Sequence, residues 1–277
     1  MHPVNTQMPQ APLRDIEIKI PYTTSPQMAS FAGPPFQRDP DVTILQEKRV
    51  ELSVFGHDLH GMVDAPVSRA LVQGACAVTD RPVTDDIVEF ALQFEEDVAL
   101  MHDGRLQCIC FCFPSSWIPR SRLGCRLEEI HAPVGDGDRL VQASPKIAQA
   151  MSTMGPFRRH VWTLAMSGDR SQHPVRKPLV EPQGIEQLWF RVETQTTLPL
   201  GDGQSSLFFV KVDAVPLQRI FEDRQRARRI CDSVFSMSDA ILDYKGLAPA
   251  KKVLEDYALR ELGHLTLTHP PHEPAAR

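Results

Sequence analysis

The chain of 277 residues lacks a basic surplus and any long apolar run. Its 30 lysines and arginines are outnumbered by 35 acidic residues, which gives a formal net charge of −5 at pH 7. A surface that binds nucleic acid or anionic lipid needs clustered positive charge, so the composition argues against both. A transmembrane helix needs about 20 consecutive apolar residues, and no stretch approaches that length. We therefore expect no nucleic-acid partner and no membrane partner.

Signals for secretion, nucleotide binding and hydrolysis are also missing. Six cysteines in a chain of this size do not form a disulfide framework. The polar, proline-containing residues 1–13 lack the apolar core of a secretory signal. The glycine-containing turns at 135–137 and 201–203 lack the spacing of phosphate-binding loops, and no Gly-x-Ser-x-Gly elbow occurs. We expect a soluble cytoplasmic protein with reduced thiols.

Proline is abundant, with 24 residues, and it divides the chain. Residues 1–40 contain eight prolines and predict an extended N-terminal arm, with a short strand at 16–20 where apolar residues alternate. Residues 41–262 predict a single domain. The polar, proline-rich residues 263–277 predict a disordered tail.

Hydrophobic periodicity within the domain predicts an α+β fold. Asp103-Gly104 stands between two apolar runs, which is a strong hairpin signal. The pattern gives about five antiparallel strands with flanking helices. The expected strands are 98–101, 106–113, 159–166, 189–197 and 206–212, and the expected helices are 84–95 with Thr84 as its cap, 123–130 ending before His131, 145–154, 217–237 and 248–262. Residues 41–54 fit either a helix or a strand.

Two groups of potential metal ligands have simpler interpretations. Cys108, Cys110 and Cys112 alternate along a predicted strand, so their thiols share one face. Cysteine is among the most buried residue types, and structural zinc sites usually take thiolates from turns, so the pattern favours core packing. His57 and His60 have helical spacing, but flanking glycines weaken a helix and a third ligand is missing.

A polar row on the predicted strand 189–197 has two interpretations. Arg191, Glu193 and Gln195 alternate, which places them on one face of the sheet. Such a row is typical of the solvated outer face of an antiparallel sheet. If the face lines a pocket, the carboxylate can bind an ammonium ion or move protons, and the guanidinium can polarise a bound oxygen.

His131 is the remaining candidate ligand. It follows a predicted helix and precedes Pro133. A lone histidine is more often a surface or hydrogen-bonded residue than a ligand. Haem iron, however, needs only one protein ligand, so the absence of companion ligands does not count against a haem site.

Five segments, taken in their order along the chain, resemble the haem-dependent oxidative N-demethylase alpha-subunit family. The resemblance extends over about residues 30–260. The segments are Glu95-Glu96-Asp97-Val98, Phe113-Pro114-Ser115-Ser116-Trp117, Ile130-His131-Ala132-Pro133-Val134, Arg191-Val192-Glu193-Thr194-Gln195-Thr196 and Tyr244-Lys245-Gly246-Leu247.

The resemblance implies a PAS-like fold, in which a five-stranded antiparallel sheet with flanking helices holds haem b. It implies that ferrous haem binds dioxygen and that a small amine such as dimethylamine is oxidised, with a methyl group leaving as formaldehyde. Electrons would come from NADPH through flavin and iron–sulfur centres on partner reductase subunits. By motif, His131 becomes the proximal iron ligand. Arg191 and Glu193 become distal-pocket residues with a catalytic role, and Gln195 lies beside them.

The sequence departs from the family pattern at a few positions. Ala165-Met166 stand where the family usually has Asn-Trp, and Gly135 stands where it usually has proline. These changes bear on the amine substrate more than on the haem. Two alternatives to an enzyme are a PAS-type sensor or gas-binding protein that holds haem without turnover, and an interaction protein that has lost its cofactor.

Overall fold

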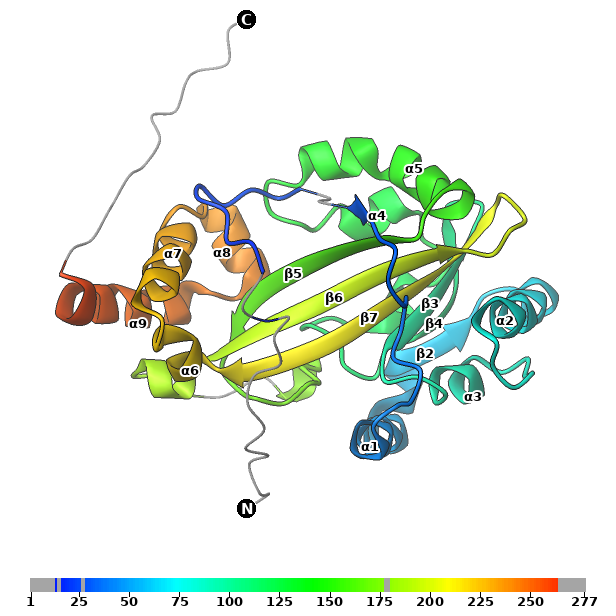
Figure 1. The fold of residues 1–277 in the computed structure, drawn as a ribbon, viewed down its shortest axis with the longest axis horizontal. Coiled ribbons are helices and arrows are strands. Elements are labelled where there is room, and N and C mark those ends of the chain that lie inside the picture. Colours follow the sequence, from blue (N-terminus) through cyan, green and yellow to red (C-terminus); the bar gives the residue numbers. More distant parts are fainter. Residues whose placement is uncertain (1–12, 14–15, 26–27, 177–179, 264–277) are drawn as a thin grey trace, which may run out of the picture.

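The computed structural model describes residue 13 and residues 16–25, 28–176 and 180–263 (Figure 1). The predicted disordered tail lies almost wholly outside these residues, and so does most of residues 1–15 of the predicted arm. None of the described helices is long and apolar enough to cross a membrane.

A single antiparallel sheet of seven strands runs through the described part of the chain, in the order β1-β5-β6-β7-β3-β4-β2. The expected count of five was therefore too low. The five longer strands were all predicted, and the two additional strands are edge strands of two and three residues, too short to show alternation. The strands are β1 (Ala29–Ser30), β2 (His60–Met62), β3 (Asp97–His102), β4 (Arg105–Cys110), β5 (Phe157–Ala165), β6 (Trp189–Pro199) and β7 (Ser205–Pro216).

The predicted hairpin joins β3 to β4 through Asp103 and Gly104. Their φ angles are 48° and 70°, both in the left-handed region that a two-residue type I′ turn requires. Asparagine, aspartate and glycine tolerate this region best, so the dipeptide identified the turn for a physical reason.

Three helices pack near β3, β4 and β2. They are α1 (Val42–Leu59), α2 (Ala65–Thr79) and α3 (Ile87–Ala91). Helix α3 is shorter than predicted. It starts later because Asp86, not Thr84, caps its first amides. The Thr84 hydroxyl instead donates to Glu89 Oε2 at 2.6 Å. The core here includes Cys108, Cys110 and Cys112, each 0% exposed, which confirms the core-packing interpretation.

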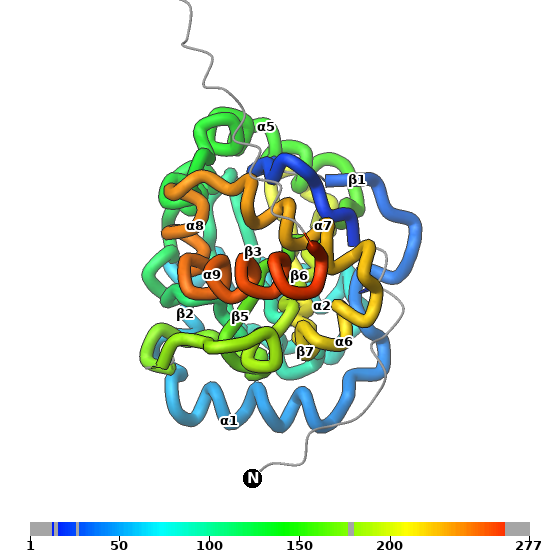
Figure 2. The backbone as a smooth tube through the Cα atoms, turned by 90° about the vertical axis from the view of Figure 1, so that its left-hand side faces the viewer, coloured from blue at the N-terminus to red at the C-terminus, as the bar shows by residue number. Residues whose placement is uncertain are grey.

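Four helices gather at the other end of the sheet (Figures 1 and 2). They are α6 (Leu217–Phe221), α7 (Arg224–Phe235), α8 (Asp239–Lys245) and α9 (Ala248–Tyr257), with a π-turn at Ala258–Leu262. The helix predicted over 217–237 is broken because Asp223 accepts from the amides of residues 225 and 226 and starts α7 anew.

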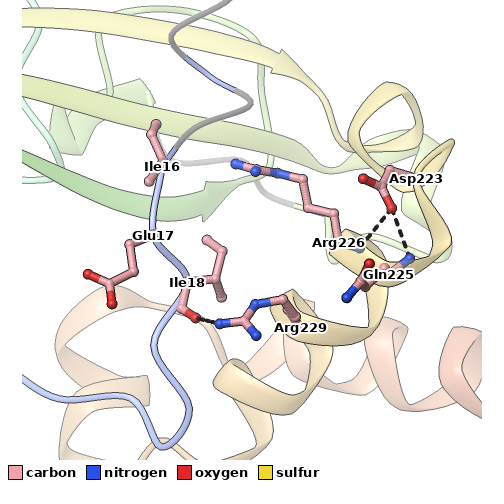
Figure 3. Close-up of a pocket in the computed structure, with 7 residues that line it drawn as sticks. All are labelled: Ile16, Glu17, Ile18, Asp223, Gln225, Arg226 and Arg229. Atoms are coloured by element: carbon pink, nitrogen blue, oxygen red, sulfur yellow. Dashed lines mark hydrogen bonds between the residues drawn. The ribbon is translucent and has the colours of Figure 1, made fainter.

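The expected strand at 16–20 is wrong, although the alternation that suggested it is real. Ile16 and Ile18 are buried in the second core cluster, but the Ile18 carbonyl accepts from Arg229 of α7 and the Lys19 carbonyl accepts from Ser233. Side chains of a helix thus satisfy carbonyls that a neighbouring strand would otherwise bind. The shallow pocket where this segment crosses α7 is shown in Figure 3.

Two helices lie along the opposite side of the sheet from α1 (Figures 1 and 2). Helix α4 (Leu127–His131) ends on His131 rather than before it, and α5 (Asp138–Thr153) starts seven residues before the predicted 145. Helix α5 contacts β6 and β7. Short 3-10 turns occur at Pro119–Arg122, Pro174–Arg176 and Ile185–Gln187.

Candidate functional site

His131 lies at the end of α4, half-buried and turned toward α5. Its Nδ1 is 3.0 Å from the hydroxyl of Ser144, thirteen residues later on α5. Burial, together with the nearby cation Arg159, lowers the pKa of His131 to about 4. The imidazole is therefore neutral near pH 7, which is the state that can bind a metal ion.

The row on β6 is buried rather than solvated. Arg191 is 1% exposed and Gln195 is 9% exposed, while Glu193 between them is half-buried. The interpretation of this row as the solvated outer face of a sheet is therefore wrong. The three side chains share one face, as their alternation predicts.

The guanidinium of Arg191 is held by a group of acceptors around it. It donates to the carbonyls of Arg170 and Phe113, at 2.6 and 3.0 Å, and to the hydroxyl of Ser115 from both Nε and Nη2, at 3.3 and 3.0 Å. These bonds use four of its five N–H groups. Burial lowers the pKa of Arg191, and the neighbouring Glu193 opposes that shift.

Glu193 connects Arg191 to the rest of the row. Its Oε1 accepts a hydrogen bond from Ser115, and its Oε2 accepts from Gln195 Nε2 at 2.8 Å. The Oε1 of Gln195 in turn accepts from Arg159 Nε at 2.6 Å. Arg159 pairs directly with Gln195 across β5 and β6, which places both on the same face of the sheet.

Arg159 is the residue that brings His131 and the β6 row together. It is half-buried, donates to Gln195 and is close enough to His131 to lower the pKa of the imidazole. Burial also lowers the pKa of Arg159 itself, against the opposing effect of Glu193. The strand register, which pairs Arg159 with Gln195, is what identifies this arginine as part of the site.

Lys245 adds a second cation at the edge of β5. Its Nζ donates to the carbonyl of Trp162 at 3.1 Å and lies 5.4 Å from the ring of Tyr22. Burial lowers the pKa of Lys245 to about 8, with Glu193 acting in the opposite direction. Ser115 and Lys245 both stand in the motifs that carry the family resemblance, but neither was assigned a role from the sequence.

The loop after His131 packs tightly against α8. A Cβ on Gly135 would lie less than 3.0 Å from the carbonyl of Ala240, so a side chain there would strike backbone. Next to it, Ser238 donates to Asp136 Oδ2 at 2.7 Å. The glycine that replaces the usual proline of the family thus permits close contact between this loop and α8.

The sheet near the site is only partly covered. Val161 and Thr163 on β5 point to the same face as Glu193 and Arg191, their register partners, and both are half-buried. This face therefore offers apolar and polar surface beside a neutral imidazole.

Other metal sites find no support in the described residues, which contain no group of three or more His, Cys, Asp or Glu side chains able to hold a metal ion. The structure places His57 on α1 with its side chain 87% exposed, and His60 on β2. The two histidines therefore do not share a helical face.

A comparison with protein-family models gives a match over much of the chain. Residues 67–255, about two thirds of the chain, match the model described as haem-dependent oxidative N-demethylase, alpha subunit-like. The matched span contains His131, the β6 row and Lys245.

Proposed function

Because the chain belongs to the haem-dependent oxidative N-demethylase, alpha subunit-like family, we propose that it binds haem b through His131 and oxidises a small amine with dioxygen. The observation that carries this proposal is the continuous hydrogen-bonded path from Glu193 through Gln195 to Arg159, which lies beside the neutral imidazole of His131. His131 and the polar row on β6 are far apart in the sequence, and Arg159 lies beside both.

The residues present fit haem. The donor set is one neutral imidazole, which suffices for a haem iron but not for a structural zinc ion. Arg159 is a half-buried cation next to that imidazole, suited to pairing with a carboxylate of the cofactor. Haem held by His131 would supply the activation of dioxygen, because a haem iron needs only one protein ligand.

Within this proposal Glu193 binds the amine. A carboxylate that is half-buried and held by two donors is positioned to accept a hydrogen bond from a protonated amine. Ser115 and Gln195 fix the orientation of the carboxylate, and the electrostatic attraction is strong because the surroundings are largely buried.

Arg191 has a positioning role in the proposal. Most of its N–H groups are engaged by two carbonyls and by Ser115, which itself donates to Glu193. The guanidinium therefore acts on the substrate through Ser115 and Glu193.

The remaining parts of the proposal follow from the family. An alpha subunit-like chain implies partner subunits, and we propose that these are reductase subunits which deliver electrons from NADPH through flavin and iron–sulfur centres. We also propose a PAS-like architecture for a single domain over 41–262. The five long strands, in the order β5-β6-β7-β3-β4 with helices along them, support this part.

A visible absorption spectrum tests the haem ligand. Protein reconstituted with haem is expected to show a Soret band, and His131→Ala is expected to lose or shift it, whereas His57→Ala, which removes an exposed histidine, leaves it unchanged. A missing band, or an identical band in His131→Ala, would refute the assignment. Amine-dependent formaldehyde release with a supplied reductase tests the reaction.

The alternative of a haem-binding sensor or gas-binding protein rests on Ala165. This residue faces the same side of the sheet as Arg191, where the resembled family usually has asparagine. Loss of a polar group there could leave a site that binds gas without turnover. Binding of oxygen or carbon monoxide, without amine-dependent consumption of electrons, would favour this alternative over the enzyme.

A further inference from the structure

We propose that Ser144 is a positioning residue for His131, holding the imidazole in the tautomer that has its proton on Nδ1 and its lone pair on Nε2. The metal-binding consequence rests on the proposed haem function. The hydrogen bond that fixes the tautomer does not, because it is made by two side chains of the protein itself.

The hydroxyl of Ser144 has a single proton to donate. Ser144 is fully buried in α5, and its Oγ donates to the carbonyl of Leu140 at 2.8 Å. That bond uses the only hydrogen that the hydroxyl can donate. The same Oγ lies 3.0 Å from His131 Nδ1. With its proton directed at Leu140, the oxygen can only accept, so Nδ1 must donate.

A neutral imidazole carries one proton, so donation from Nδ1 leaves Nε2 unprotonated. Nε2 is then the nitrogen able to bind iron. Metal-bound histidines almost always donate their other ring N–H to a fixed acceptor, which sets the tautomer and the ring orientation. Ser144 supplies such an acceptor before any metal is bound.

The bond to Leu140 also fixes the direction of the acceptor. A serine that bonds the carbonyl four residues earlier in its helix has its side-chain rotamer set by that bond. Ser144 presents its lone pair to α4 from the interior of a sixteen-residue helix. A site carried on helices in this way is held more precisely than one carried on loops.

The acceptor is a neutral hydroxyl, not a carboxylate. A carboxylate acceptor pulls the Nδ1 proton and raises the basicity of the ligand nitrogen. A hydroxyl that already donates elsewhere has a weaker effect. We expect an ordinary neutral imidazole ligand, with orientation as the main contribution of Ser144.

The tautomer can be measured without haem. Two-bond proton–nitrogen correlation NMR on the ¹⁵N-histidine-labelled full chain reports which ring nitrogen carries the proton. The parent protein is expected to show His131 protonated on Nδ1 at pH 7, and Ser144→Ala is expected to lose that preference. Protonation on Nε2 in the parent, or an unchanged Nδ1–H signal in Ser144→Ala, would overturn the proposal.

The chain offers a matched control in Ser152. It lies on the same helix, is 6% exposed, and donates to the Ala148 carbonyl at 2.9 Å, four residues earlier. Ser152→Ala therefore removes a similar hydroxyl and a similar backbone bond without touching His131. It is expected to leave the His131 signals unchanged, and a loss of the Nδ1–H signal in this variant too would mean that any defect in α5 disturbs the ring.

Haem titration separates the two levels of the proposal. Ser144→Ala is expected to bind haem about 10–100-fold more weakly than the parent, while Ser152→Ala binds as the parent does. Equal affinity in Ser144→Ala would overturn the positioning role. If the parent protein shows the Nδ1-protonated tautomer by NMR but takes up no haem, the hydrogen-bond assignment is supported and the proposed function is refuted.

Discussion

Replacing Arg191 by methionine tests how far the site depends on a buried cation. The side chain is 1% exposed and bonds two backbone carbonyls and the Ser115 hydroxyl. Methionine has a similar length and is readily buried, but it cannot donate a hydrogen bond. The substitution therefore removes the Arg191 donor from three acceptors and the nearby positive charge from Glu193.

The cost follows from these contacts. A hydrogen bond to a charged group contributes about 1.5–3 kcal/mol, and an unsatisfied buried acceptor costs about 1–3 kcal/mol. Relief of the desolvation of the guanidinium offsets part of this loss. We expect Arg191→Met to lower the free energy of unfolding by about 3–5 kcal/mol, the range for breaking a buried charge network. A domain is typically stable by about 5–15 kcal/mol, so the variant would be marginal.

Urea unfolding at pH 7, extrapolated linearly to water, measures this loss. Arg139→Met is the control, because Arg139 is exposed on α5 and its replacement should cost less than about 0.5 kcal/mol. Arg191→Lys keeps the charge but not the fork of donors, and we expect an intermediate loss of about 1.5–3 kcal/mol. If Arg191→Met unfolds within about 1 kcal/mol of the parent, the guanidinium does not hold the site together.

Four further predictions concern the site and its supports. Glu193→Gln should unfold within about 1–2 kcal/mol of the parent but lose amine-dependent turnover at least tenfold, and unchanged formaldehyde release would exclude the carboxylate as the amine ligand. Lys48 donates to three backbone carbonyls and lies 3.8 Å from Asp97, so Lys48→Met should lower the free energy of unfolding by about 3–5 kcal/mol. The double variant with Asp97→Asn should lose less than the sum of the two single losses, and additive losses in urea unfolding would contradict this coupling. Burial raises the pKa of Asp97 to about 6, although Lys48 and two backbone amides act in the opposite direction. Folding therefore favours the protonated carboxyl, so the stability of the parent should fall relative to Asp97→Asn as the pH rises from about 4 to about 6. Parallel stability–pH profiles of the two proteins would contradict this pKa shift. Gly135→Ala should cost about 1–3 kcal/mol by overpacking against α8, while Gly74→Ala, which has open space in α2, should be neutral or stabilising in the same thermal melts.

Much of the sheet could be predicted because its signals are local. The Asp103-Gly104 dipeptide located the β3–β4 hairpin, and the apolar patterns along the chain located β5, β6 and β7. Helices were placed less well because their ends depend on side-chain caps. Asp86 and Asp223 each start a helix that the apolar pattern alone extends or merges.

The site itself could be predicted only in part. Alternation puts Arg191, Glu193 and Gln195 on one face, but the same alternation fits a solvated face. Only tertiary packing, which buries Arg191 and Gln195, decides between the two. The contacts that make the site cross long intervals of sequence: Ser115 reaches Glu193 from 78 residues away. No local pattern contains that information, because register and tertiary packing create it.

Ala165, one of the departures from the family pattern, lies beside the β6 row. Ala165 pairs with Trp189 at the end of β5, one step beyond the pair of Thr163 and Arg191 on the same face. An asparagine there would add a polar group next to the positioning network, and alanine makes that end smaller and apolar. His131 is held from α5 by its hydrogen bond with Ser144. Under the proposed function, the change at Ala165 therefore bears on which amine fits beside Glu193, and it leaves the contact between Ser144 and His131 untouched.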